Sequence, residues 1–308
     1  MLGLCCRHRR KAVSRMCPSS ASVGRHGPLS GKSRRRAPEI PGRLASIFLN
    51  AAFPRRCREC GVLYAADLRA AAPASSAGGL EAAFSAAVAG YFCTPCRQVA
   101  WARSPMCTQC GLPFVSDQGV DHLCGHCAEA VINFDAARAA AMYQHGLRTL
   151  IHDFKYRGRE YLAESLGRLL WAALIKHWDP DDFDIILPVP LHWRRLYRRG
   201  FNQADLLMRC WPRAASEAGM LFDHGKIARR LLIRQRRTAS QTGLNRRQRK
   251  SNLRRAFTLG DRQAEVRGRR ILIVDDVFTT GATVDACGRV LKRAGAISVK
   301  VLTLARAG

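Results

Sequence analysis

Residues 271–283 read ILIVDDVFTTGAT, a purely aliphatic run that ends in two adjacent carboxylates and a Thr/Gly loop. A short apolar run rich in β-branched residues is typical of a buried strand. The residues after the loop, VDACGRVLKRAG, have helical spacing, so this stretch predicts a strand, a tight loop and a helix. Such a unit belongs to a parallel sheet with helical crossovers, which limits the fold to the α/β class.

The same alternation of strands and helices extends through the second half of the chain. The sequence predicts a strand leading into a helix from residue 134, an amphipathic helix in YLAESLGRLLWAALIKHW, a buried strand in DIILPVPLH, helical structure from Gln203 to about Gly219 with a kink at Pro212, and a last strand in SVKVLTLARA. We therefore expect an α/β fold with a parallel sheet, and ligands at the C-terminal ends of its strands.

Asp275 and Asp276 lie at that ligand-binding edge. Successive strand side chains point to opposite faces, so both carboxylates share one groove only where the strand is already turning. A sugar diol is a natural partner, because its two hydroxyls can each donate to a carboxylate oxygen. The loop from Thr279 to Thr283 opens a helix, where backbone N–H groups suit a phosphate. Together these features predict a site for ribose 5-phosphate. The simpler alternative is that a threonine caps the helix and one aspartate caps the turn.

Eight of the thirteen cysteines form four CxxC pairs: Cys57 and Cys60, Cys93 and Cys96, Cys107 and Cys110, Cys124 and Cys127. Two such pairs close one four-thiolate zinc site, so the pattern predicts two structural zinc ions. Disulfides, a redox CxxC and an iron–sulfur cluster are weaker alternatives. The pairing stays open between neighbouring pairs and a nested arrangement.

The net charge of +28 is concentrated in two blocks. Residues 1–56 hold thirteen Lys and Arg with one acid, and residues 226–260 hold twelve with none. Such blocks attract polyanions, although a biased coding composition explains the first block as well. We expect residues 1–43 to be a basic, disordered extension. No apolar run approaches the length of a membrane span, so we expect none and a cytoplasmic location.

The string ILIVDDVFTTGAT resembles the phosphoribosyl-pyrophosphate-binding motif of type I phosphoribosyltransferases. The wider chain is similar to the ComF family of competence-associated proteins, through FKYRGR, PVPLHWRRLYRRGFNQA, RTASQTGLNRRQRKSNLRRAF and the four CxxC pairs. The resemblance implies a type I phosphoribosyltransferase fold over residues 131–308, preceded by a double zinc-ribbon domain over residues 44–130.

The resemblance also implies roles for individual residues. Asp275, Asp276, Lys155 and Arg237 are the expected catalytic residues, and the two aspartates take the ribose hydroxyls. The expected substrate contacts are Thr279, Thr280, Gly281, Ala282 and Thr283 with the 5-phosphate; Val189, Pro190, Leu191 and His192 with the pyrophosphate; and Arg157, Gln241 and Arg249 with the phosphate oxygens or within a mobile Arg-rich hood.

These roles imply a magnesium-dependent phosphoribosyltransferase, in the pentosyltransferase class, that displaces pyrophosphate at the anomeric carbon. No residue in the sequence names the acceptor. The alternative is a non-catalytic competence factor that senses nucleotides or binds single-stranded DNA during DNA uptake. The zinc module would then dock a partner such as a competence helicase, and a homodimer is one expected assembly.

Overall fold

The computed structural model describes residues 54–64, 79–116, 118–235, 256–260 and 263–308. The chain divides into two compact units, Met1–Pro41 and Gly42–Gly308, and the first unit lies wholly outside the described residues. The expectation of a disordered extension over residues 1–43 therefore lies outside them as well. Among the described residues, no helix is both long enough and apolar enough to cross a bilayer.

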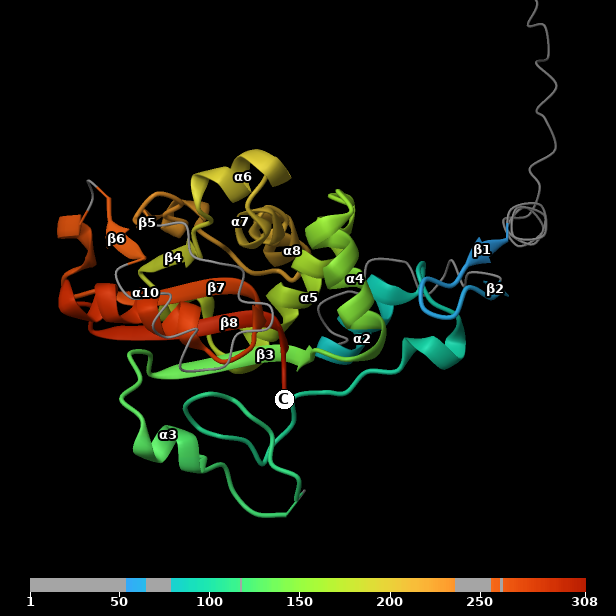
Figure 1. The fold of residues 1–308 in the computed structure, drawn as a ribbon, viewed down its shortest axis with the longest axis horizontal. Helices are drawn as coiled ribbons and strands as arrows, with labels where there is room; N and C mark the ends of the chain where they lie inside the picture. The colour runs from blue at the N-terminus through green and yellow to red at the C-terminus, as the bar shows by residue number, and fades with distance from the viewer. Residues whose placement is uncertain (1–53, 65–78, 117, 236–255, 261–262) are drawn as a thin grey trace, which may run out of the picture. The chain divides into compact units, whose positions relative to one another are not determined.

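A four-stranded parallel sheet organises the second unit (Figure 1). Its strands are β3 (Ala136–Met142), β8 (Ser298–Arg306), β7 (Arg270–Phe278) and β4 (Ile185–Pro188), in the spatial order β3-β8-β7-β4. All three pairings are parallel, and Val274 of β7 lies opposite Leu302 on one side and Pro188 on the other. The predicted α/β class and parallel sheet are confirmed.

The sheet is buried on both faces, because alternate residues of each strand enter different hydrophobic cores. Leu272 and Val274 of β7 enter the first core, with Leu302 and Leu304 of β8. Ile271 and Ile273 enter the second, with Val299 and Val301. The aliphatic run in β7 is continuous because the strand has no solvent-facing side.

The first core is covered mainly by helices: α2 (Gly79–Val88), α4 (His145–Tyr156), α5 (Leu162–His177), α7 (Gln203–Met208) and α8 (Trp211–Glu217). Leu166, Leu169, Leu170 and Leu174 of α5 are fully buried, as the helical spacing predicted. The predicted interruption near Pro212 is also confirmed, because α7 ends at Met208 and Pro212 occupies the first turn of α8.

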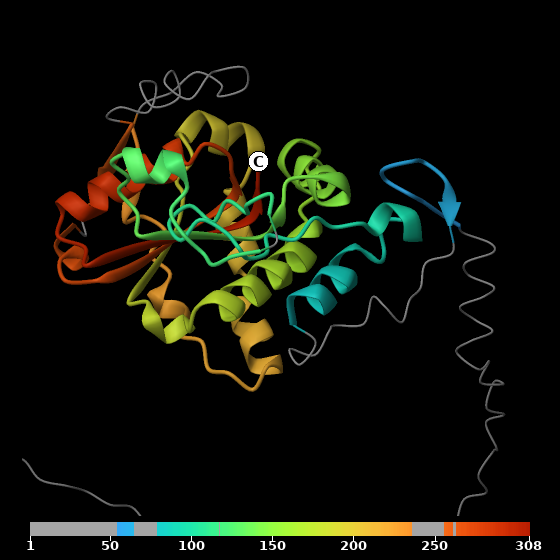
Figure 2. The ribbon, with the colours of Figure 1, turned by 90° about the horizontal axis from the view of Figure 1, so that it is seen from below.

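The second core lies under α10 (Ala282–Arg293) and the antiparallel pair β5 (Leu232–Arg234) and β6 (Phe257–Leu259). Helix α3 (Gly125–Glu129) also contributes, and Figure 2 shows it beside α10 at one end of the sheet. The remaining described elements are β1 (Arg55–Arg56), β2 (Leu63–Tyr64), α6 (Trp193–Arg199), η2 (Thr94–Arg97), η3 (Pro180–Asp182), η4 (His224–Lys226) and η5 (Gln263–Val266).

The CxxC pairs, which we call cysteine knuckles, contribute to different hydrophobic cores. Cys57 and Cys93 belong to the first core, whereas Cys107, Cys110 and Cys127 belong to the second. The N-terminal cysteines are therefore built into both layers that cover the sheet, within the same compact unit. A separate domain over residues 44–130 stays a proposal, and its boundary at residue 130 falls between α3 and β3.

Candidate functional site

The two adjacent carboxylates of β7 point to opposite faces, as the strand period requires. Asp276 follows Val274 by two residues and so lies on the same side of β7. Its Oδ1 lies 2.8 Å from Nζ of Lys155 on α4. Asp275 shares the parity of Ile273, and its charge acts on Arg234 of β5 and Cys287 of α10. Asp275 also bends toward the end of the strand, because its Oδ1 accepts the Asp276 backbone N–H at 2.9 Å.

Burial and neighbouring charges shift the pKa values of Asp275 and Lys155. Burial, followed by the neighbouring Asp276 charge, raises the pKa of Asp275 to about 8. Burial alone would lower the pKa of Lys155, but the charge of Asp276 outweighs it and holds that pKa above its usual value. The site thus combines one carboxylate that is ion-paired with one that ionises reluctantly. Such groups are common where a cationic ligand or metal completes the charge balance.

The predicted phosphate loop follows at the end of β7. Gly281 has φ +74°, and a Cβ there would come within 2.6 Å of the Phe278 ring, so the position requires glycine. Thr280 Oγ1 accepts the Ala282 backbone N–H at 3.4 Å, whereas the N-cap position of α10 is Gly281, which has no capping side chain. Helix α10 begins at Ala282, so the N–H groups of its first turn lie beside this loop. This geometry suits an anion.

The loop after β4 lies beside the end of β7. Val189 N donates to Val274 O at 2.8 Å, and Asn202 Nδ2 donates to Val189 O at 3.0 Å. Pro190 is buried and Leu191 half-buried. His192 is buried and caps α6, because its Nδ1 accepts the Arg194 backbone N–H at 3.3 Å. This cap is a structural role for His192.

The structure brings some predicted site residues together and places others elsewhere. Lys155 reaches the Asp pair, and the Val189–His192 loop flanks it. Arg157 instead pairs with Asp153 at 3.1 Å, beside the first cysteine cluster. Three of the predicted hood residues lie outside the described residues: Arg237, Gln241 and Arg249.

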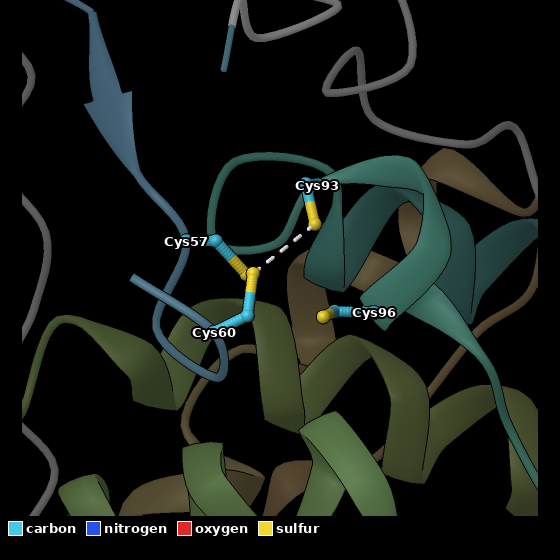
Figure 3. A group of neighbouring side chains, drawn as sticks. All are labelled: Cys57, Cys60, Cys93 and Cys96. Carbon is cyan, nitrogen blue, oxygen red and sulfur yellow. Dashed lines mark hydrogen bonds between the residues drawn. The ribbon is translucent and has the colours of Figure 1, made fainter. Parts of the chain in front are cut away.

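The eight paired cysteines form two four-thiol clusters, and the neighbouring pairing is confirmed. Cys57, Cys60, Cys93 and Cys96 make one cluster, and Cys107, Cys110, Cys124 and Cys127 the other. Figure 3 shows the first set converging. Cys60 Sγ lies 3.7 Å from Cys93 Sγ, and Cys110 Sγ lies 3.8 Å from Cys124 Sγ. Four sulfurs around zinc at about 2.3 Å are separated by about 3.8 Å, so both sets fit tetrahedral zinc.

Backbone groups favour the thiolate form in which a metal is held. The N–H groups of Cys110 and Cys124 each lie 3.4 Å from Cys107 Sγ. Burial alone would raise the pKa of Cys107, but these donors lower it to about 6. Closed four-thiolate sites leave no open coordination position, so zinc held in either cluster would have a structural role.

Each cluster is tied to the sheet layers by arginines that the sequence analysis did not single out. Arg58, between Cys57 and Cys60, donates to the buried Asp153 of α4 at 3.1 Å. Arg306, at the end of β8, donates to Cys110 O at 2.6 Å. In the sequence, Arg58 is recognisable only as an arginine inside a CxxC pair, and Arg306 only as an arginine at the end of an aliphatic strand. Neither pattern specifies its partner.

Comparison with known proteins agrees with this geometry. Residues 217–308 match the family model described as "Phosphoribosyl transferase domain". The chain is 37% identical over 218 residues to "DNA utilization protein YhgH" of Escherichia coli strain K12, covering 70% of this chain and 89% of the relative. It is 32% identical over 206 residues to "Competence protein F" of Haemophilus influenzae, covering 66% and 85%. It is 26% identical over 208 residues to "Competence protein ComFC" of Bacillus subtilis, covering 65% and 78%.

The parallel sheet, the matched domain and the loop after β7 define a protein with a phosphoribosyltransferase domain. Two four-cysteine clusters accompany that domain in the preceding part of the chain. With the identity and coverage shown by its relatives, the chain belongs to the ComF/YhgH family.

Proposed function

We propose that this protein binds phosphoribosyl pyrophosphate, or a related ribose phosphate, at the C-terminal end of β7 and acts as a phosphoribosyltransferase. The observation that carries the proposal is one continuous stretch: Asp275 and Asp276 close β7, and a loop that requires Gly281 leads directly into α10. Carboxylates for a diol and a helix N-terminus for a phosphate follow each other within a few residues.

The proposed roles follow from the positions of the side chains. Lys155 holds Asp276 in place and adds positive charge where pyrophosphate oxygens would lie. The Thr279–Thr283 loop takes the 5-phosphate. Beside it, the pyrophosphate would meet the backbone N–H groups of Leu191 and His192, because the Val189 N–H is bonded to Val274 O and Pro190 has none. Arg237, Gln241 and Arg249 would close over the bound anion as the hood. Carboxylates near the sugar stabilise the positive charge that develops at the anomeric carbon.

Magnesium fits this proposal as a metal that arrives with its ligand. In the described part of the chain, the clusters of three or more possible metal ligands are the two all-cysteine sets. No dedicated oxygen cage is seen there, and magnesium in phosphate chemistry commonly uses substrate oxygens and one or two carboxylates. Asp275 is the carboxylate we assign to that role, because Asp276 is already paired with Lys155.

Isothermal titration with phosphoribosyl pyrophosphate and magnesium tests the binding claim. We expect wild type to bind and the Asp275→Asn/Asp276→Asn variant to lose measurable heat. A matched control is Asp181→Asn/Asp182→Asn, another adjacent pair, which lies near Arg270 at the start of β7. Equal heats from wild type and the Asp275/Asp276 variant would refute the ribose site.

A second candidate function, binding single-stranded nucleic acid, is favoured by a basic cavity of about 500 Å³ beside the first cluster. Arg55, Arg56, Arg58 and Arg157 line it, with Asp153 as the acidic residue in the lining. Tyr91 also lines the cavity, with the Arg58 guanidinium 5.9 Å from its ring centre. Relatives named for competence and DNA utilization make this class of ligand reasonable.

Salt dependence separates the two functions. If the arginine-lined cavity holds a nucleic-acid backbone, the affinity for single-stranded DNA should fall steeply with salt, and Arg56→Gln should reduce the slope. Titration of phosphoribosyl pyrophosphate should leave that DNA affinity unchanged, because the cavity and the Asp pair involve different residues. A salt-independent or undetectable interaction would exclude this second function.

A further inference from the structure

The second cysteine cluster has a direct contact with the last strand of the sheet. Arg306 of β8 donates from Nη1 to Cys110 O at 2.6 Å and from Nη2 to Cys110 Sγ at 3.4 Å. Arg306 is only 6% exposed. A buried guanidinium requires compensating negative charge, and metal-bearing thiolates supply it. Arg306 is therefore held in place by the charge of the cluster.

The Phe278 ring contacts two residues, Arg306 and Phe134, that are each hydrogen-bonded to the Cys107–Cys110 knuckle. The Arg306 guanidinium carbon lies 4.6 Å from the centre of the Phe278 ring. On another side the Phe134 ring meets it edge-on, with centroids 5.9 Å apart. Gln109, between the cysteines of the knuckle, donates from Nε2 to Phe134 O at 3.0 Å. These two neighbours of the Phe278 ring are therefore bonded to Cys110 and Gln109, which are adjacent residues of the knuckle.

Phe278 in turn supports the phosphate loop. It is the last residue of β7, and its carbonyl accepts the Ala307 N–H at 2.8 Å. The ring lies so close to Gly281 that a Cβ there would be 2.6 Å from it. The loop cannot keep its conformation if the ring moves toward it, and it loses its support if the ring moves away.

We propose that Arg306 is a positioning residue that couples the second cluster to the phosphate loop, so that an intact, metal-bearing cluster is needed for tight binding of a 5-phosphate. The proposal rests on the function proposed above for that loop. Loss of the metal would free the Cys107–Cys110 knuckle, whose Cys110 carbonyl holds Arg306, and displacement of Arg306 would release Phe278. The cluster would then control the affinity for substrate from outside the ribose site.

The first cluster provides a control within the same chain. Its arginine, Arg58, binds Asp153 of α4 on the opposite face of the sheet. In the described contacts, Arg58 meets Asp153, Tyr91 and Tyr161 and not the loop after β7. Disturbing the first cluster should therefore leave the phosphate loop unchanged.

Hydrogen exchange of the loop amides tests the coupling without a ligand. In full-length, zinc-loaded protein, Arg306→Met should speed exchange at residues 279–283 relative to β4, and Arg58→Met should not. Cys124→Ser should have the same local effect, and adding Arg306→Met to it should change nothing further, because both act through one contact. Uniformly faster exchange across the sheet, or no change at the loop, would overturn the proposal.

Ribose 5-phosphate titration gives the functional measurement. We expect Arg306→Met to weaken binding about tenfold, the range for losing a charged hydrogen bond, with Arg306→Lys in between because it keeps the charge. Wild-type affinity in Arg306→Met would refute the coupling. If wild type itself does not bind ribose 5-phosphate, the proposed function fails, while the exchange experiment still decides whether Arg306 positions the loop.

Discussion

At the scale of single residues, Lys155 and Asp276 join helix α4 to the end of the central strand β7. Their side chains are 16% and 11% exposed, and their charged atoms are 2.8 Å apart. A buried ion pair adds little net stability compared with apolar residues of similar size. Removing one partner nevertheless destabilises the protein, because the other charge stays buried without a partner. The pair therefore stabilises the end of β7, where the ribose site is proposed, and its members cannot be replaced independently.

Lys155→Met should reduce the free energy of unfolding by about 3 kcal/mol, because the Asp276 carboxylate stays buried without a partner. Urea denaturation of the ligand-free protein measures this loss. The control is Lys226→Met, which breaks a pair with the 81% exposed Asp181 and should cost far less, because solvent screens that pair. Equal losses would show that the Lys155 pair is no more buried in solution than a surface pair.

The raised pKa of Asp275 predicts that its contribution to stability falls as the pH rises. A carboxylate whose pKa is lowered by an ion pair has the opposite effect. The pKa of Asp275 is raised to about 8 in the folded protein, against about 3.9 when unfolded. The unfolded chain therefore releases this proton first, so its stabilising contribution is complete below about pH 4 and disappears as the pH rises through about 8. Asp275→Asn should lose less stability than wild type between these limits, as measured by denaturation at several pH values. Parallel curves would contradict the raised pKa.

At the scale of elements, the β7–loop–α10 unit was predicted closely because its signals are local. An aliphatic run, a Thr/Gly loop and a helical period each specify backbone conformation without help from distant residues. The strand period alone also placed Asp275 and Asp276 on opposite faces. By contrast, neither Phe278 under Gly281 nor Arg306 on Cys110 has a local signature, because those contacts depend on how separate segments pack.

Gly281 allows the backbone and the packing requirements of this loop to be separated. Gly281→Ala should cost about 1 kcal/mol for its positive φ, and about 2 kcal/mol more because its Cβ would strike the Phe278 ring. Gly268→Ala is a matched control, since Gly268 has φ +75° and a Cβ added there would meet no heavy atom within 4 Å. Thermal denaturation of both variants measures the difference. Equal costs would mean that Phe278 does not support the loop.

At the scale of the whole molecule, the position of the knuckles was the least predictable feature. Spacing predicted two four-cysteine sites, and neighbouring pairing was one of two open arrangements. Their assignment to different hydrophobic cores has no signal in the spacing, because it depends on apolar contacts with residues far along the chain. The predicted ribbon domain stays a proposal, and the cysteines in its described part contribute to both hydrophobic cores.

Metal analysis should find about two zinc ions per chain, one for each cluster. Cys60→Ser and Cys124→Ser should each reduce the content by about one, and chelation should lower the thermal midpoint, since metal binding contributes folding free energy. A wild-type content near one would refute the two-site assignment. Because the clusters lie in different cores, the two variants should expose different protease sites.

The strand order has a consequence for how the protein is made on the ribosome. Strand β8 is translated after β3, β4 and β7, yet it lies between β3 and β7. Until it emerges, β3 has no partner in the sheet, and the knuckles made earlier have only part of the apolar surface on which they finally pack. A nascent chain halted before β8 should therefore remain protease-sensitive and open to chaperones, and the sheet should form only as synthesis of this region finishes.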